Sequence, residues 1–169
     1  GNDLLDGRGG FDQAVYNTSF LTASGVSVNM AMGTVSGDAT IGIDTLRSIE
    51  QVIGTNFADT YDATGFSGSS TNAGSNGTFN SFQGAGGDDT ITGNDNTQIA
   101  FFSATGAVMV DLAAGTASGN ASVGNDTITG GVNNVQGSNF GDTLTGSGNN
   151  ETFTGGGGGG NDTINGGGG

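Results

Sequence analysis

Aspartates that follow glycines at a fixed spacing are the residues of this sequence best suited to chemistry. The segment GGGGNDTIN (157–165) fits a nine-residue pattern, Gly-Gly-x-Gly-x-Asp-x-apolar-x, in full. GAGGDDTIT (84–92) departs from it at one position, and GRGGFDQAV (7–15) carries Arg8 in place of the second glycine. Glycine has no Cβ, so its backbone carbonyl is free to approach an ion, and each aspartate adds a carboxylate. Such an all-oxygen donor set suits Ca²⁺, a hard cation that takes about six to eight oxygens.

The candidate ligands are the acids and glycines of these segments and acids at related places in the chain. They are Asp3, Gly7, Gly10, Asp12, Gly84, Gly87, Asp89, Asp126, Asp142, Gly157, Gly160 and Asp162. A clean nine-residue step joins only Asp3 to Asp12, so we expect a few calcium sites, near these two, near Asp89 and near Asp162, instead of a continuous series. Isolated acids such as Asp38, Asp62 and Asp95 are expected to stabilise turns through Asx-type hydrogen bonds.

The composition makes a cation the natural partner. Among 169 residues there are 16 acids and two bases, for a formal net charge of −14. Phosphates would be repelled, so we expect no nucleic-acid partner and no binding to anionic membrane surfaces. No apolar run approaches the roughly 20 residues of a membrane span. The chain has no His, Cys or Lys, so the usual bases and nucleophiles of catalysis are missing and we predict no enzyme.

The chain also repeats itself. Residues 25–46 align with residues 107–128 at an offset of 82, and residues 49–65 align with residues 132–148. A partial third copy spans residues 79–93. We therefore predict two tandem units, 1–83 and 84–169, in one continuous solenoid that forms part of a longer array.

Short strands must position these turns. VSVNM (26–30) and VMVDL (108–112) alternate apolar and polar residues, the period of a β-strand. DTITG, DTLTG and DTIN each place one apolar residue between threonines, which predicts a short strand with its central side chain inward. Residues 44–53 are predicted as strand and turn, not helix. The fold predicted is all-β, a right-handed parallel β-roll or β-helix whose turns are made by glycine and asparagine.

The nonapeptides resemble the haemolysin-type (RTX) calcium-binding repeats of secreted bacterial proteins. In that family, turns of successive coils hold calcium through glycine carbonyls and aspartate carboxylates. The resemblance implies export, commonly by type I secretion, and folding outside the cell, where calcium is abundant. An extracellular or cell-surface location follows from it. An acidic, glycine-rich chain is otherwise typical of disorder, and bound metal would supply the folding energy that a thin core lacks.

Three functions are compatible with these features. The first is a calcium-stabilised structural segment of an extracellular bacterial protein: an adhesin stalk, a surface layer or a filament. The alternative is a calcium-triggered folding and secretion module of an exported enzyme or toxin. A third, less favoured, is an ice- or surface-binding threonine array, which the spacers between the repeats are expected to interrupt. The exposed strands at either end predict end-to-end self-association or contact with neighbouring repeats of the same protein.

The phenylalanines allow two interpretations. They could form a platform for a ligand, or they could pack in the core, which their repeat-equivalent positions favour. Core packing is therefore predicted for most of Phe11, Phe57, Phe101, Phe102 and Phe140. The adjacent pair Phe101 and Phe102 must point to opposite faces of a strand.

Overall fold

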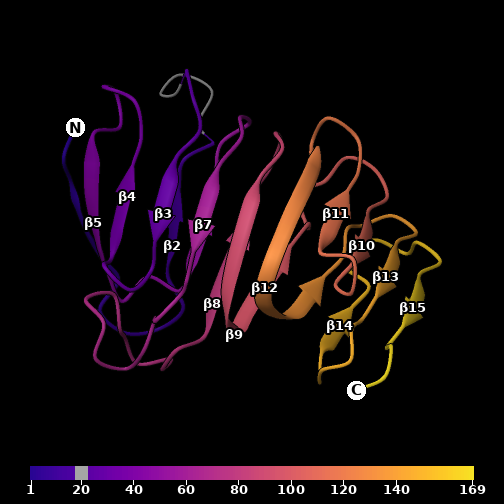
Figure 1. Cartoon of the computed structure of the whole chain (residues 1–169). Helices are drawn as coiled ribbons and strands as arrows, with labels where there is room; N and C mark the ends of the chain where they lie inside the picture. Colours follow the sequence, from indigo (N-terminus) through magenta and orange to yellow (C-terminus); the bar gives the residue numbers. More distant parts are fainter. Residues whose placement is uncertain (18–22) are drawn as a thin grey trace.

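The computed structural model describes residues 1–17 and 23–169, and its regular structure is entirely β-strand (Figure 1). The fifteen strands of these residues form one large mixed sheet. Their bounds are β1 Leu4–Asp6, β2 Gln13–Val15, β3 Ser27–Asn29, β4 Thr34–Ser36, β5 Ile43–Arg47, β6 Gln51–Ile53, β7 Thr60–Asp62, β8 Asn80–Gln83, β9 Thr90–Ala100, β10 Met109–Asp111, β11 Thr116–Ser118, β12 Asn125–Gln136, β13 Thr143–Thr145, β14 Thr152–Thr154 and β15 Thr163–Asn165. The all-β prediction is confirmed, and residues 44–53 form strand and turn as expected.

The strands are arranged in two rows. The first row runs β1-β5-β4-β3-β7-β9-β12-β11-β10-β13-β15, and the second runs β2-β6-β8-β9-β12-β14. The long strands β9 and β12 belong to both rows, because their first halves pair in the first row and their second halves in the second. In Figure 1 the first row faces the viewer, and β2 and β8 lie behind it.

Glycines allow β9 and β12 to pass from one row to the other. A Cβ on Gly93 would lie 2.1 Å from the carbonyl oxygen of Gly131, so the two backbones meet where only glycine fits. Gly130 and Gly131 have φ values of 141° and 69°, which side chains disfavour, and the pairing register shifts at this point. The shift bends both strands together and encloses a core between the two rows.

The sheet is mixed, whereas the sequence predicted parallel pairing throughout. Of the fourteen strand pairs in the described residues, ten are parallel and four antiparallel. In each repeat the chain reverses direction twice and forms three antiparallel strands, β3-β4-β5 in the first and β10-β11-β12 in the second. We call each of these three-strand segments an antiparallel excursion. Val28 pairs with Val35, and Val110 pairs with Ala117, so the offset of 82 in the sequence is kept in the register. Residues of left-handed conformation, Gly33 and Gly42, make the tight turns of the first excursion.

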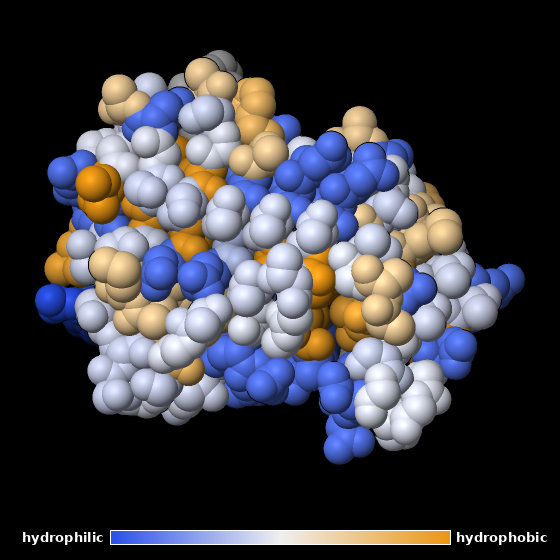
Figure 2. Space-filling model, viewed as in Figure 1, coloured by the Kyte–Doolittle hydropathy of each residue, from blue (hydrophilic) through white to orange (hydrophobic). Residues whose placement is uncertain are grey.

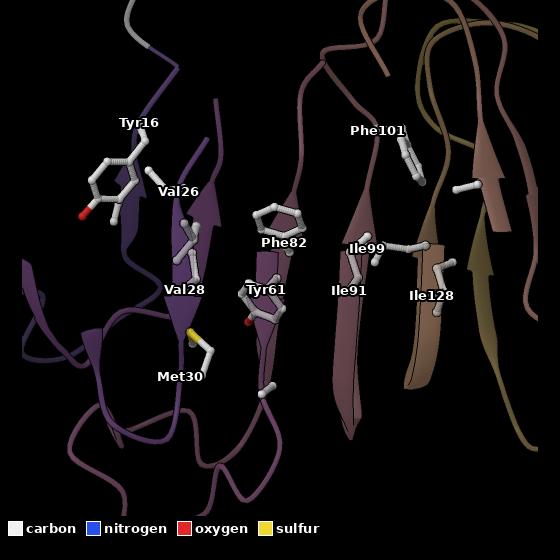
Figure 3. Close-up of a cluster of buried hydrophobic side chains, with 14 of the residues drawn as sticks. Tyr16, Val26, Val28, Met30, Tyr61, Phe82, Ile91, Ile99, Phe101 and Ile128 are labelled. Carbon is white, nitrogen blue, oxygen red and sulfur yellow. The ribbon is translucent and has the colours of Figure 1, made fainter. Parts of the chain in front are cut away.

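The core consists of the central side chains of the short strands, which point inward between the rows (Figure 3). In the described residues its largest fully buried members are Tyr61, Phe82, Met30, Leu46, Ile91, Ile99 and Leu144. The rings of Tyr61 and Phe82 stack across the rows at 4.8 Å between centroids. The predicted inward side chain is confirmed in the interior strands but wrong for Ile164, which is 49% exposed. Its strand, β15, pairs only with β13 in the structure described.

The phenylalanines singled out in the sequence differ in burial. Phe101 is buried and Phe102 is exposed, but both follow the end of β9 at Ala100, so the prediction that they lie on opposite faces of a strand was wrong. Core packing was the wrong prediction for Phe11, Phe57 and Phe140, which are all exposed. They lie in turns just before an aspartate, and the inside of each turn is occupied by that aspartate's carboxylate, so the ring is left outside.

Candidate metal centre in the glycine–aspartate turns

A line of carboxylates crosses the first row of strands where each strand begins. The N–H of Val26 donates to Asp59 Oδ1 (2.7 Å), and the N–H of Asp59 donates to Asp89 Oδ1 (2.8 Å). The N–H of Asp89 donates in turn to Asp126 Oδ1 (3.0 Å). Each carboxylate thus binds the backbone of the neighbouring strand, and three buried acids lie in succession along the edge of β7, β9 and β12.

The same contact recurs outside this line. Val108 donates to Asp142 Oδ1 (2.8 Å), and Asp142 donates to Asp162 Oδ1 (3.0 Å). At the other end of the first row Asp3 donates to Asp44 Oδ1 (2.9 Å), and in the second row Asp12 donates to Glu50 Oε2 (2.9 Å). Acids at strand starts therefore serve first as acceptors for backbone N–H groups that the ladder leaves free.

In the turns of Asp59, Asp89 and Asp142, the glycine five residues before the acid is required by the carboxylate that folds back over it. A Cβ on Gly84 would lie 1.7 Å from Asp89 Oδ2, and one on Gly54 would lie 2.1 Å from Asp59 Oδ2. At Gly137 the corresponding distance to Asp142 Oδ2 is 2.3 Å. No real Cβ tolerates such contacts, so the glycine and the acid form one unit.

In two turns this unit is closed by a hydroxyl residue that follows the glycine. Thr55 donates its N–H to Asp59 Oδ2 (2.6 Å) and its hydroxyl to Asp59 Oδ1 (2.9 Å). Ser138 donates in the same way to Asp142, with both distances 2.6 Å. Both oxygens of each carboxylate therefore have partners within the protein. We call these the closed turns.

In two other turns the unit remains open. Ala85 and Arg8, which follow Gly84 and Gly7, both have φ of 66° and carry no hydroxyl. Oδ2 of Asp89 and Oδ2 of Asp12 are buried without a hydrogen-bond partner in the structure described. Asp89 as a whole is only 1% exposed, so water does not compensate. A buried oxygen in this condition is costly unless another group binds it.

The electrostatics of the line are unfavourable in the absence of a cation. Burial raises the pKa of Asp89 to about 8, and the neighbouring carboxylates of Asp126 and Asp59 add to the rise. Burial, together with Asp88 and Asp59, raises the pKa of Asp126 to about 7. The pKa of Asp59 is also raised by burial, although its hydrogen bonds oppose the shift. The line is thus a place where protons are retained or positive charge is attracted.

The structure brings some of the predicted ligands together and separates others. Gly84, Gly87, Asp89 and Asp126 meet in and beside one turn. Asp3 and Asp12, by contrast, lead into strands of different rows and contact different acids.

The remaining predicted ligands lie in or beside other turns. Gly7 and Gly10 lie in the open turn of Asp12, and Asp142 lies in a closed turn. At the C-terminal end Gly157 and Gly160 pass over residues 139–141. There the glycine under the carboxylate of Asp162 is Gly155, which the nine-residue pattern does not single out.

The prediction for isolated acids is confirmed at two positions. Asp38 accepts the N–H of Thr40 (2.9 Å), and Asp62 accepts the N–H of Thr64 (2.8 Å), both in Asx-type geometry. Two acids of the carboxylate contacts, Asp44 and Glu50, were not among the predicted ligands. Asp44 could have been found, because Gly42-x-Asp44-Thr45 matches Gly124-x-Asp126-Thr127. Glu50 could not, because its repeat equivalent is Asn133.

The arrangement does not amount to a metal cage of side chains. Within residues 1–17 and 23–169, no group of three or more His, Cys, Asp or Glu side chains is placed to hold a metal ion. A calcium site at the open turns would therefore depend on backbone carbonyls as well as carboxylates, which calcium accepts. In the same residues no helix is long and apolar enough to span a membrane.

Comparison with protein-family models and with curated proteins finds no match to this chain.

Proposed function

We propose that this chain is a calcium-stabilised structural segment of an extracellular bacterial protein, such as an adhesin stalk, a surface layer or a filament. The observation that carries the proposal is Asp89 Oδ2, a buried carboxylate oxygen without a partner in a glycine turn. A cation at this turn would satisfy the oxygen and offset the charge of the neighbouring acids. Calcium is the cation favoured, because the donors available are carboxylates and glycine carbonyls.

The residues that would hold the ion fit this role. Asp89 and the backbone of Gly84 and Gly87 belong to one turn, and the carboxylate of Asp126 lies on the adjacent strand. Gly87 has φ of 113°, and a Cβ there would lie 2.4 Å from the backbone of Phe57, so the turn packs closely on its neighbour. Bound calcium would supply positive charge at this turn, where Asp89 is only 1% exposed. The turn of Asp12 is the second candidate.

The architecture we infer is a right-handed parallel β-solenoid with one antiparallel excursion in each repeat. In its support, β3, β7, β9 and β12 pair in parallel in one row, while β2, β6, β8 and β9 pair in parallel in the other. Inward side chains of the two rows share one core. Such an architecture buries each layer only against its neighbours and is suited to an elongated, load-bearing segment.

The proposal is tested by calcium titration of the chain and of two matched variants. Asp89→Asn keeps the acceptor for the N–H of Asp59 but removes the ionised oxygen. Asp142→Asn makes the same change in a closed turn. We expect calorimetry to show calcium binding to the unmodified chain, a reduced number of bound ions for Asp89→Asn, and an unchanged number for Asp142→Asn. Absence of calcium binding by the unmodified chain, or equal loss in the two variants, would contradict the proposal.

A further inference from the structure

The outer face of the first row of strands carries aligned hydroxyl and amide side chains. One line of residues in mutual register runs across ten strands, and each member is the paired neighbour of the next. It consists of Ile43, Ser36, Ser27, Thr60, Thr90, Thr127, Thr116, Asp111, Thr145 and Asn165. A second line, two residues further along the strands, consists of Thr45, Thr34, Asn29, Asp62 and Thr92. We call these two lines the hydroxyl face.

The spacers between the repeats continue the hydroxyl face, contrary to the expectation that they interrupt it. The antiparallel strands β4 and β11 arise from the spacers, and they place Thr34, Ser36 and Thr116 in register with the repeat strands. The hydroxyl groups of Thr92 and Thr129 form a hydrogen bond of 2.5 Å where β9 and β12 pair. The threonines therefore form one surface and not separate patches.

The hydroxyl face is regular, with the centre of its long line exposed and its second line half-buried. Its threonines at 60, 90, 116 and 127 are exposed, while the residues between them in sequence are buried in the core. Neighbouring strands lie about 4.8 Å apart, and alternate residues along a strand about 6.6 Å apart, which makes a two-dimensional repeat. Figure 2 shows this face, and a line of pale residues, the colour of Thr and Ser on its scale, crosses it. A depression lined by Asp111, Thr116 and Thr145 of the long line, together with Met109 and Thr143, ends the regular part at β12.

The chemistry of the hydroxyl face indicates the kind of partner. From Ser27 to Thr116 the long line has no charged residue, although the chain carries a net charge of −14. The second line adds a single acid, Asp62, so an ionic partner would find little complementary charge on this part of the face. None of its members is aromatic, so it offers no ring for stacking on bases or sugar rings. Each hydroxyl both donates and accepts hydrogen bonds, and each threonine adds a methyl group.

We infer that the hydroxyl face binds ice, a partner that is neutral, repeats in two dimensions and presents both donors and acceptors. Single hydroxyl contacts with water are weak, but a rigid array makes many of them at once, and their effects combine without further ordering of side chains. Strands β3, β7, β9 and β12 supply the regular centre of this array. This inference rests on the register of the strands and not on the metal proposed above.

The test measures thermal hysteresis and the partition of the protein into slowly growing ice, with calcium present. The double variant Thr90→Tyr/Thr127→Tyr places bulky rings at the centre of the hydroxyl face. Thr152→Tyr/Thr154→Tyr makes the same change on β14, an exposed strand of the second row. We expect the unmodified chain and the β14 variant to show hysteresis and to enter the ice, and the central variant to lose most of both. Thr116→Lys on β11 probes the same face independently, should the double variant fail to fold.

Three results would overturn the inference. The first is an unmodified, folded chain that shows no hysteresis and is excluded from ice. The second is equal loss in the central and β14 variants, because the effect would then not belong to this face. The third is binding to powdered crystalline cellulose or chitin without partition into ice, which would assign the face to a carbohydrate lattice.

Discussion

At the scale of single residues, the turns show how one position changes the environment of a carboxylate. Gly137 and Gly84 each lie under the carboxylate of the aspartate five residues later in the chain. Ser138 gives Asp142 two hydrogen bonds, whereas Ala85, in the left-handed region, leaves one oxygen of Asp89 without any. The residue after the glycine thus distinguishes the turn of Asp142, where both carboxylate oxygens are bonded within the protein, from the turn of Asp89, where one is not.

The hydroxyl of Ser138 has a measurable role. Ser138→Ala removes the donor at 2.6 Å from the buried Asp142 Oδ1 and leaves the backbone donors in place. We expect a loss of about 1 kcal/mol in the free energy of unfolding, the usual worth of a buried hydrogen bond, measured by urea denaturation. Ser69→Ala is the control, since Ser69 is exposed and bonds only to another surface serine. Equal effects of the two substitutions would contradict the closed-turn description.

Gly84 offers a second test at this scale. In Gly84→Ala the new methyl group would overlap Asp89 Oδ2 at 1.7 Å, so the carboxylate must leave its place. We expect destabilisation of about 1–3 kcal/mol, the range for forced insertion into a packed site, together with weaker calcium binding. Gly68→Ala is the matched control, because nothing lies within 4 Å of its added Cβ and its φ is not positive. A Gly84→Ala chain as stable as the control would show that the carboxylate has room to move.

At the scale of elements, the sequence predicted the strands better than their pairing. Thr-Ile-Thr and Thr-Leu-Thr predict one inward side chain in a short strand, and Ile91 and Leu144 are buried accordingly. The short strand is confirmed for Leu144 in β13 but wrong for Ile91, because β9 runs on for 11 residues. The same alternation occurs in parallel and antiparallel strands, so nothing in Val26–Met30 or Thr34–Ser36 showed that these strands run in opposite directions. The tight turns at Gly33 and Gly42 determine that direction, and in a chain with 37 glycines their signal is not distinctive.

The candidate site was predictable in its residue types but not in its contacts. Regular spacing identified Asp89 and its glycines, because a nine-residue pattern contains both. Spacing alone placed Asp3 with Asp12, whereas the rows of the sheet separate them. The neighbours of an acid lie one strand away in space and up to 41 residues away in sequence, as for Asp3 and Asp44, so they follow from topology and not from local pattern.

The line of buried acids gives the metal-free chain a definite response to pH. The folded-state pKa values of Asp89, about 8, and Asp126, about 7, lie above the usual value of 3.8. Groups with raised folded pKa values bind more protons when folded, so their contribution to stability is full below about pH 4 and is lost as pH rises through 7 to 8. With calcium chelated, we expect the melting temperature to fall between pH 5 and 8.5. Asp89→Asn should flatten this fall, and a melting temperature that rises over the same range would contradict the burial of these carboxylates.

At the scale of the whole molecule, a chain with a net charge of −14 and a thin core has little margin for folding without a counter-ion. Ligands that bind only the folded state add stability as their concentration increases, by about 2.7 kcal/mol at a hundredfold excess over Kd. We therefore expect calcium at millimolar levels to raise the melting temperature and its removal by a chelator to expand the chain, as measured by small-angle scattering. Sodium chloride at matched ionic strength separates site binding from general screening, since salt weakens repulsion without filling the turn of Asp89. If salt compacts the chain as fully as calcium does, the charge of the molecule as a whole governs its folding and the open turns do not.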